Sequence, residues 1–218
     1  MRRIHITLLL AIYCLSFFLH SEQETVDRIV ALVNDQVITL TDLKIAEAFR
    51  IYDEELEGFN GNSLSLILEK LISQKLVIQL SSEKVSVEKE KLDMALKIII
   101  EKMGMDEVER KMAEFGLDWE DLRESVWEKI LYQTILSQRF SRVIIVSLKE
   151  IEDYYHQVYI PTQKEKGADP KPMIEILDEI ESILRQERIK EQVEEWLENL
   201  KKNANIQVKR EALERFKS

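Results

Sequence analysis

The chain has 218 residues, of which one is cysteine, three are proline and five are glycine. Sandwiches and barrels need many turns, and turns draw heavily on glycine and proline, so this scarcity argues against an all-β fold. Charged residues make up 33% of the chain and hydrophobic residues 45%, which suits amphipathic helices packed around a core. We therefore expect a mainly α protein.

The single cysteine, Cys14, falls in an apolar run over residues 6–19 that follows Arg2 and Arg3. A basic start, a short apolar run and a polar sequel are the layout of a secretory signal peptide. The run is shorter than the roughly 20 residues that span a bilayer as a helix. We expect residues 1–21 to be a signal peptide that is removed on export. An uncleaved segment that tethers the domain to the inner membrane is the alternative.

Removal of residues 1–21 leaves an acidic protein. The segment holds two of the 31 basic residues and none of the 41 acidic ones, so the net charge becomes 29 − 41 = −12. A surface of this sign repels phosphate backbones, which argues against binding to nucleic acid.

Residue patterns for catalysis or metal binding are missing as well. His156 is the only histidine outside residues 1–21, and the chain has no glycine-rich phosphate loop, no His-Glu-x-x-His motif and no Gly-x-Ser-x-Gly motif. Carboxylates alternate with lysines and arginines on predicted helices, as on solvated faces; they include Glu101, Glu107, Glu109 and Glu114. We expect no catalytic residue, no cofactor and no metal.

The residues that follow the predicted signal peptide favour β-strands. Two β-rich runs, residues 26–33 and 37–39, flank a polar turn and predict a hairpin. Thr41 and Asp42 indicate the start of a helix. Residues 64–80 are apolar on nearly every side, with Leu80 the last of the series, so this helix should lie at the centre of the core.

Further helix starts are indicated by serines and aspartates in capping positions. They are Ser86, Asp106 with Glu109, Asp118, and Ser147 with Glu150. The first two helices should end at Gly104 and Gly116, the third near residue 142 and the fourth near residue 159.

The last part of the chain divides at a stretch that holds all three prolines. Residues 160–172 are interpreted as a linker between a domain over residues 22–159 and a closing segment over residues 173–210. Residues 173–203 predict one amphipathic helix of about 45 Å. Residues 206–208 predict a short strand with Ile206 and Val208 facing inward, and residues 211–218 a tail.

Several stretches resemble, in the same order, the SurA family of periplasmic chaperones and parvulin-type isomerases. They are residues 26–43 (VDRIVALVNDQVITLTDL), 68–77 (LEKLISQKLV), 85–88 (VSVE), 115–120 (FGLDWE), 147–155 and 183–208. The resemblance implies that the N-terminal strands pair with the C-terminal strand in a small sheet. It also implies a periplasmic location.

Relatives in this family commonly carry one or two parvulin domains between the last two of these stretches. Here that place holds only residues 160–172, which are too few for an isomerase domain. The resemblance then implies an ATP-independent chaperone that holds unfolded or outer-membrane-type client polypeptides and has no prolyl isomerase activity. The alternative is a structural or adaptor protein of the cell envelope with one dedicated partner.

Binding of many different clients calls for adaptable apolar side chains, and methionine and aromatic residues suit this task. Such residues cluster in the third predicted helix and the next short one. The candidate client-binding residues are Met94, Met103, Met105, Met112, Phe115 and Trp119. Each of them also fits an ordinary core position at helical spacing, and Trp127 and Trp196 are interpreted as core residues.

Overall fold

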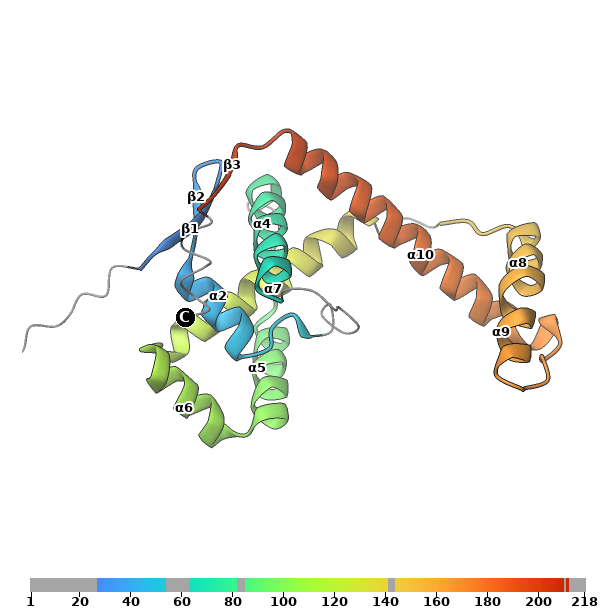
Figure 1. Ribbon diagram of the computed structural model, residues 1–218, viewed down its shortest axis with the longest axis horizontal. Helices are drawn as coiled ribbons and strands as arrows, with labels where there is room; N and C mark the ends of the chain where they lie inside the picture. The colour runs from blue at the N-terminus through green and yellow to red at the C-terminus, as the bar shows by residue number, and fades with distance from the viewer. Residues whose placement is uncertain (1–26, 54–62, 82–84, 141–143, 210, 212–218) are drawn as a thin grey trace, which may run out of the picture.

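The computed structural model describes residues 27–53, 63–81, 85–140, 144–209 and 211, so the predicted signal peptide and most of the predicted tail lie outside the described residues. A main lobe holds the strands and the helices α2, α4, α5, α6 and α7, and a small lobe holds α8 and α9 (Figure 1). One long helix, α10, joins the small lobe to the strands. The expected mainly α fold with a small sheet is confirmed.

The sheet joins the two ends of the described chain. Strands β1 (Ile29–Val33) and β2 (Gln36–Thr39) form the predicted hairpin, and β3 (Ile206–Val208) pairs antiparallel with the other side of β1. Asn34, in the hairpin turn, has a φ of 56°, a conformation that asparagine tolerates. Its amide donates to the Asn205 carbonyl at 2.8 Å, and its side-chain oxygen accepts from the Asn205 amide at 3.0 Å. The predicted closing strand is therefore confirmed.

Val208 departs from the predicted alternation. Ile206 pairs with Val33 and packs against the main core, whereas Val208 pairs with Ala31 and is 41% exposed. The prediction that Val208 is a core residue is wrong, because β3 is an edge strand with a neighbouring strand on one side only, and Val208 stays partly exposed there.

Helix α4 (Ser63–Ser81) is the central helix of the main lobe, as predicted. It contacts α2 (Leu40–Ala48), α7 (Trp119–Phe140) and α10 (Met173–Lys202), as well as β1 and β2. Its buried apolar side chains are Leu64, Ile67, Leu68, Leu71, Ile72, Leu76, Val77 and Ile78. Leu80 is the exception at 61% exposed, although Ile78 and Gln79 of the same turn contact the rest of the lobe.

Helices α5 (Lys89–Met103) and α6 (Met105–Phe115) complete the main lobe. They end as predicted, at Gly104 and Gly116, whose positive φ angles of 86° and 66° favour glycine. Their predicted N-caps are wrong. Helix α5 starts after Glu88 instead of Ser86, and α6 after Gly104 instead of Asp106.

The remaining helix starts follow the capping rules. Thr39 caps α2, since its hydroxyl accepts from the Asp42 amide while the Asp42 carboxylate accepts from the Thr39 amide. The predicted start at Thr41 was thus two residues late. Asp118 caps α7 through the amides of Glu120 and Asp121, as predicted. The predicted capping box of Ser147 is also present, and it begins α8 (Leu148–Tyr154).

Helix α10 confirms the prediction of one long helix and contacts both lobes. Near its C-terminal end, Trp196, Leu197 and Leu200 pack against buried residues of α4 and α7. The Trp196 ring meets the Phe140 ring edge-on at 5.6 Å, and the Arg139 guanidinium lies 4.4 Å from the Trp196 ring centre. In the small lobe, Ile176 and Ile180 pack against Ile151 of α8.

The helix that begins at Ser147 continues further than predicted. It passes through a π-helix, η1 (Tyr155–Tyr159), into α9 (Ile160–Glu165), so about half of the predicted linker is helical. Pro161 lies in the first turn of α9, directly after the wider turn of η1. In a regular α-helix its ring would clash with the carbonyl four residues earlier, and the π-turn is a local adjustment found next to such positions.

Candidate functional site

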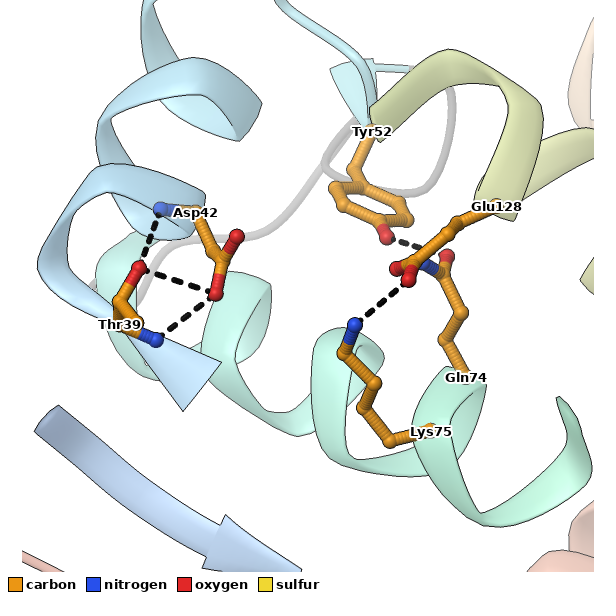
Figure 2. A network of polar contacts seen from close by, with 6 residues as sticks. All are labelled: Thr39, Asp42, Tyr52, Gln74, Lys75 and Glu128. Carbon is orange, nitrogen blue, oxygen red and sulfur yellow. Dashed lines mark hydrogen bonds and ion pairs between the residues drawn. The ribbon is translucent and has the colours of Figure 1, made fainter. Parts of the chain in front are cut away.

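A buried polar network joins the turn after α2 to helices α4 and α7 (Figure 2). The Tyr52 hydroxyl donates to Gln74 Oε1 at 2.8 Å, and Gln74 Nε2 donates to Glu128 Oε2 at 3.0 Å. The Lys75 ammonium donates to Glu128 Oε1 at 2.6 Å, and both side chains are mostly buried. Because both Glu128 oxygens accept hydrogen bonds, the network serves to hold α4 against α7.

Asp42 lies beside this network at the start of α2 (Figure 2). Burial raises the pKa of its carboxyl group above the usual value, while the hydrogen bond from the Thr39 amide and the charge of Lys75 act in the opposite direction. Since the carboxylate closes the capping box with Thr39, its role is to start the helix.

Two adjacent helices of the main lobe each carry exposed apolar side chains. On α5, Met94 is 66% and Ile98 44% exposed, and their spacing of four residues places them on one face. On α7, Trp119 is 39% and Trp127 38% exposed, with Arg123 halfway between them. Arg123 forms an ion pair of 3.8 Å with Asp93, the residue before Met94, which links the two helices.

With Met105 at the start of α6, which is 44% exposed, these side chains form what we call the apolar set: Met94, Ile98, Met105, Trp119 and Trp127. Large hydrophobic side chains at this exposure are candidates for contacts with another molecule.

The structure places the six candidate residues from the sequence in three environments. Met94, Met105 and Trp119 are exposed. Met103 and Phe115 are partly buried against the main core, and the Lys44 ammonium lies 5.6 Å from the Phe115 ring centre. Met112 is a core residue, 6% exposed, and offers no surface.

Two members of the apolar set were missed by the sequence analysis. Ile98 lies one helical turn after Met94, which was the available signal. Trp127 was interpreted as a core residue because it lies on an apolar stripe, and its exposure of 38% shows that this was wrong. Trp196 is partly buried against the second core cluster, as its stripe predicted.

Besides the apolar cluster of Ile151, Ile176 and Ile180, a group of polar contacts joins the small lobe to α10. Glu150 accepts from the amide of Ser147 at 2.8 Å and from its hydroxyl at 2.7 Å, and it pairs with Arg188 of α10. The bonds from the Ser147 amide and hydroxyl, followed by that from Arg188, lower the pKa of Glu150 to about 2. Arg188 also donates to the Ile145 carbonyl at 2.8 Å.

Two further observations concern metal binding and membrane spans in the described ranges. Within them, no group of three histidine, cysteine, aspartate or glutamate side chains is arranged to hold a metal ion. No helix in the same ranges combines the length and apolarity that a membrane span requires.

Comparison with known proteins identifies the family. The curated relatives named chaperone SurA include those of Nitrosospira multiformis, 27% identical over 171 residues, and Pseudomonas putida, 26% identical over 153 residues. The matches cover 69% and 67% of this chain but 39% and 36% of the relatives, so the chain spans well under half of their length. The family model of the SurA N-terminal domain matches residues 26–136, which is just over half of the chain. The chain therefore belongs to the SurA N-terminal domain family.

Proposed function

We propose that this protein is an ATP-independent periplasmic chaperone that holds unfolded or outer-membrane-type client polypeptides through the apolar set on α5, α6 and α7. The observation that supports this most directly is the exposure of Met94, Ile98, Trp119 and Trp127 on helices of a domain whose named relatives are chaperones. No catalytic residue takes part in this function.

The chemistry of the set suits many clients. Methionine is flexible and polarizable, and tryptophan offers a large apolar face with one polar edge, so both adapt to different partner side chains. Exposed side chains of this kind give weak and reversible contacts, which a holding chaperone needs in order to release its client.

The absence of prolyl isomerase activity is part of the same proposal. Between η1 and the start of α10 the chain has only residues 160–172, and these form the short helix α9 and a turn. A segment of this size has no room for a folded isomerase domain. A refolding reaction limited by proline isomerisation should therefore proceed at its uncatalysed rate when the protein is added.

The periplasmic location rests on residues 1–21, which have the layout of a signal peptide. N-terminal sequencing of the exported protein tests this, and a new N-terminus near residue 22 is the expected result. An intact Met1 on a membrane-bound protein would favour the tethered alternative.

An aggregation assay tests the function. An unfolded outer-membrane protein is diluted out of denaturant with and without residues 22–218, in the absence of nucleotide, and light scattering is followed. The proposal predicts a lower rate and extent of scattering that depends on the concentration of the added protein. Unchanged scattering at several-fold molar excess would instead favour an adaptor with one dedicated partner.

A further inference from the structure

The turn between α9 and α10 lies over two tyrosines of η1 in the small lobe. The Tyr155 hydroxyl donates to the Lys171 carbonyl at 2.8 Å, and the Lys171 amide donates to the Tyr159 hydroxyl at 3.4 Å. The two rings are stacked, with centres 5.6 Å apart and planes inclined by 18°. The hydroxyl groups of two stacked tyrosines thus bond the backbone of Lys171, one at its carbonyl and the other at its amide.

The two rings form a fixed platform. Both rings pack against the apolar cluster of Ile151, Ile176 and Ile180, which holds them in place. Their hydroxyl groups bond the turn. They also belong to a π-helix, a rare conformation that is often found at functional sites.

The segment on this platform has the composition of a polyproline II ligand. Lys171 stands between Pro170 and Pro172, and residues 168–172 are neither helix nor strand. Pro172 has a φ of −54° and a ψ of 140°, and a residue before proline is driven to extended angles. Aromatic side chains that bond the backbone of an extended proline-containing segment are a recurring mode of peptide recognition.

We propose that Tyr155 and Tyr159 form a binding site for extended, proline-containing segments of polypeptides, and that Pro170 to Pro172 occupy this site in cis. The inference rests on the proposed chaperone function, for which it names one class of client segment. A tethered segment competes at an effective concentration on the order of millimolar, so it keeps the site closed to weak ligands.

The test uses a peptide copy of the cis segment, acetyl-Ala-Asp-Pro-Lys-Pro-Met-amide, and a variant of the whole protein in which the site is open. Pro170→Gly/Pro172→Gly removes the preference for the extended form, and glycine is tolerated at the N-cap that Pro172 provides for α10. Isotope-labelled protein is titrated with the peptide, and NMR shifts of the Tyr155 and Tyr159 ring signals are followed.

The peptide should bind the open variant at least about tenfold more tightly than the parent. Adding Tyr155→Phe and Tyr159→Phe to the open variant should abolish this gain, since the rings remain and only the hydroxyls are lost. A peptide with alanine in place of both prolines should bind more weakly. Glu165→Gln, a change at an exposed residue of α9 outside the turn, is the control and should leave peptide binding at the level of the parent.

The inference is wrong if the open variant binds no more tightly than the parent, or if its binding is insensitive to the tyrosine changes. Should the double glycine variant lose its fold, Pro170→Gly alone keeps the α10 N-cap and carries the same expectation. Because the readout is peptide binding, its failure beside a positive aggregation assay would reject this site and leave the proposed function standing.

Discussion

Glu150 of α8 and Arg188 of α10 are 38 positions apart in sequence and form an ion pair, while the same carboxylate closes the capping box with Ser147. One side chain thus both starts α8 and holds it on α10. The polar part of the contact between α8 and α10 therefore depends on the charge of Glu150.

Acid should loosen the small lobe. The folded state lowers the pKa of Glu150 from 4.5 to about 2, so its contribution to stability is complete above the unfolded value and is lost as pH falls toward the folded one. NMR signals of the Ile151 and Ile180 methyl groups should shift over this range. In Glu150→Gln these methyl signals should already be shifted at neutral pH and should lose most of their pH dependence. The control is Glu152→Gln, a change at an exposed carboxylate of the same helix, and its signals should behave like those of the parent.

The N-cap of α2 gives a matched pair of threonines. Thr39→Ala removes the hydroxyl that accepts from the Asp42 amide, and it should lower the free energy of unfolding by about 1 kcal/mol. Thr41→Ala, two residues later, should change it by less than about 0.5 kcal/mol because the cap is intact. Urea denaturation of both variants measures the difference, and equal effects would contradict the assignment of the cap.

The buried network predicts that substitutions of two lysines differ in their cost to stability. Lys75→Met leaves the Glu128 carboxylate in a mostly buried position without its cation and should cost about 1–3 kcal/mol. Lys97→Met breaks an exposed pair with Glu101, at 3.5 Å, and should cost under about 0.5 kcal/mol. Thermal and urea denaturation report both values. A small effect of Lys75→Met would mean that the network does not hold α4 on α7.

Substitutions at the two ends of β3 should differ in their effect on the free energy of unfolding. Ile206→Ala removes a side chain packed on the main core and should cost about 1–2 kcal/mol. Val208→Ala changes a side chain that is 41% exposed and should stay within about 0.5 kcal/mol. Chemical denaturation tests the pair, and the reverse order would show that β3 is anchored at its far end.

Local signals in the sequence predicted most of the fold. Ser147 and Glu150 satisfy each other within one turn, and Gly104 and Gly116 take conformations that few other residues accept, so these boundaries could be read from the residues alone. Ser86 has the right chemistry for a cap, but the chain stays extended through Glu88, and where an extended segment ends depends on packing.

The surface was harder to predict than the core. Met112 and Met94 have the same residue type and lie on neighbouring helices, yet one is buried and the other exposed, because burial depends on which face meets the rest of the lobe. The extension of the helix through Pro161 was missed since a proline normally ends a helix, and the π-turn that accommodates it has no clear sequence signal.

The central claim is that the apolar set holds unfolded clients, and aggregation assays on matched variants test it most directly. Met94→Gln/Ile98→Gln removes two exposed apolar side chains from the set, and Leu80→Gln/Ile174→Gln removes two of similar size and exposure outside it. Both variants should keep the melting temperature of the parent, because all four side chains are exposed. The account predicts that the first variant needs a several-fold higher concentration than the parent to suppress scattering by an unfolded outer-membrane protein, while the second matches the parent. Equal suppression by both variants would contradict it.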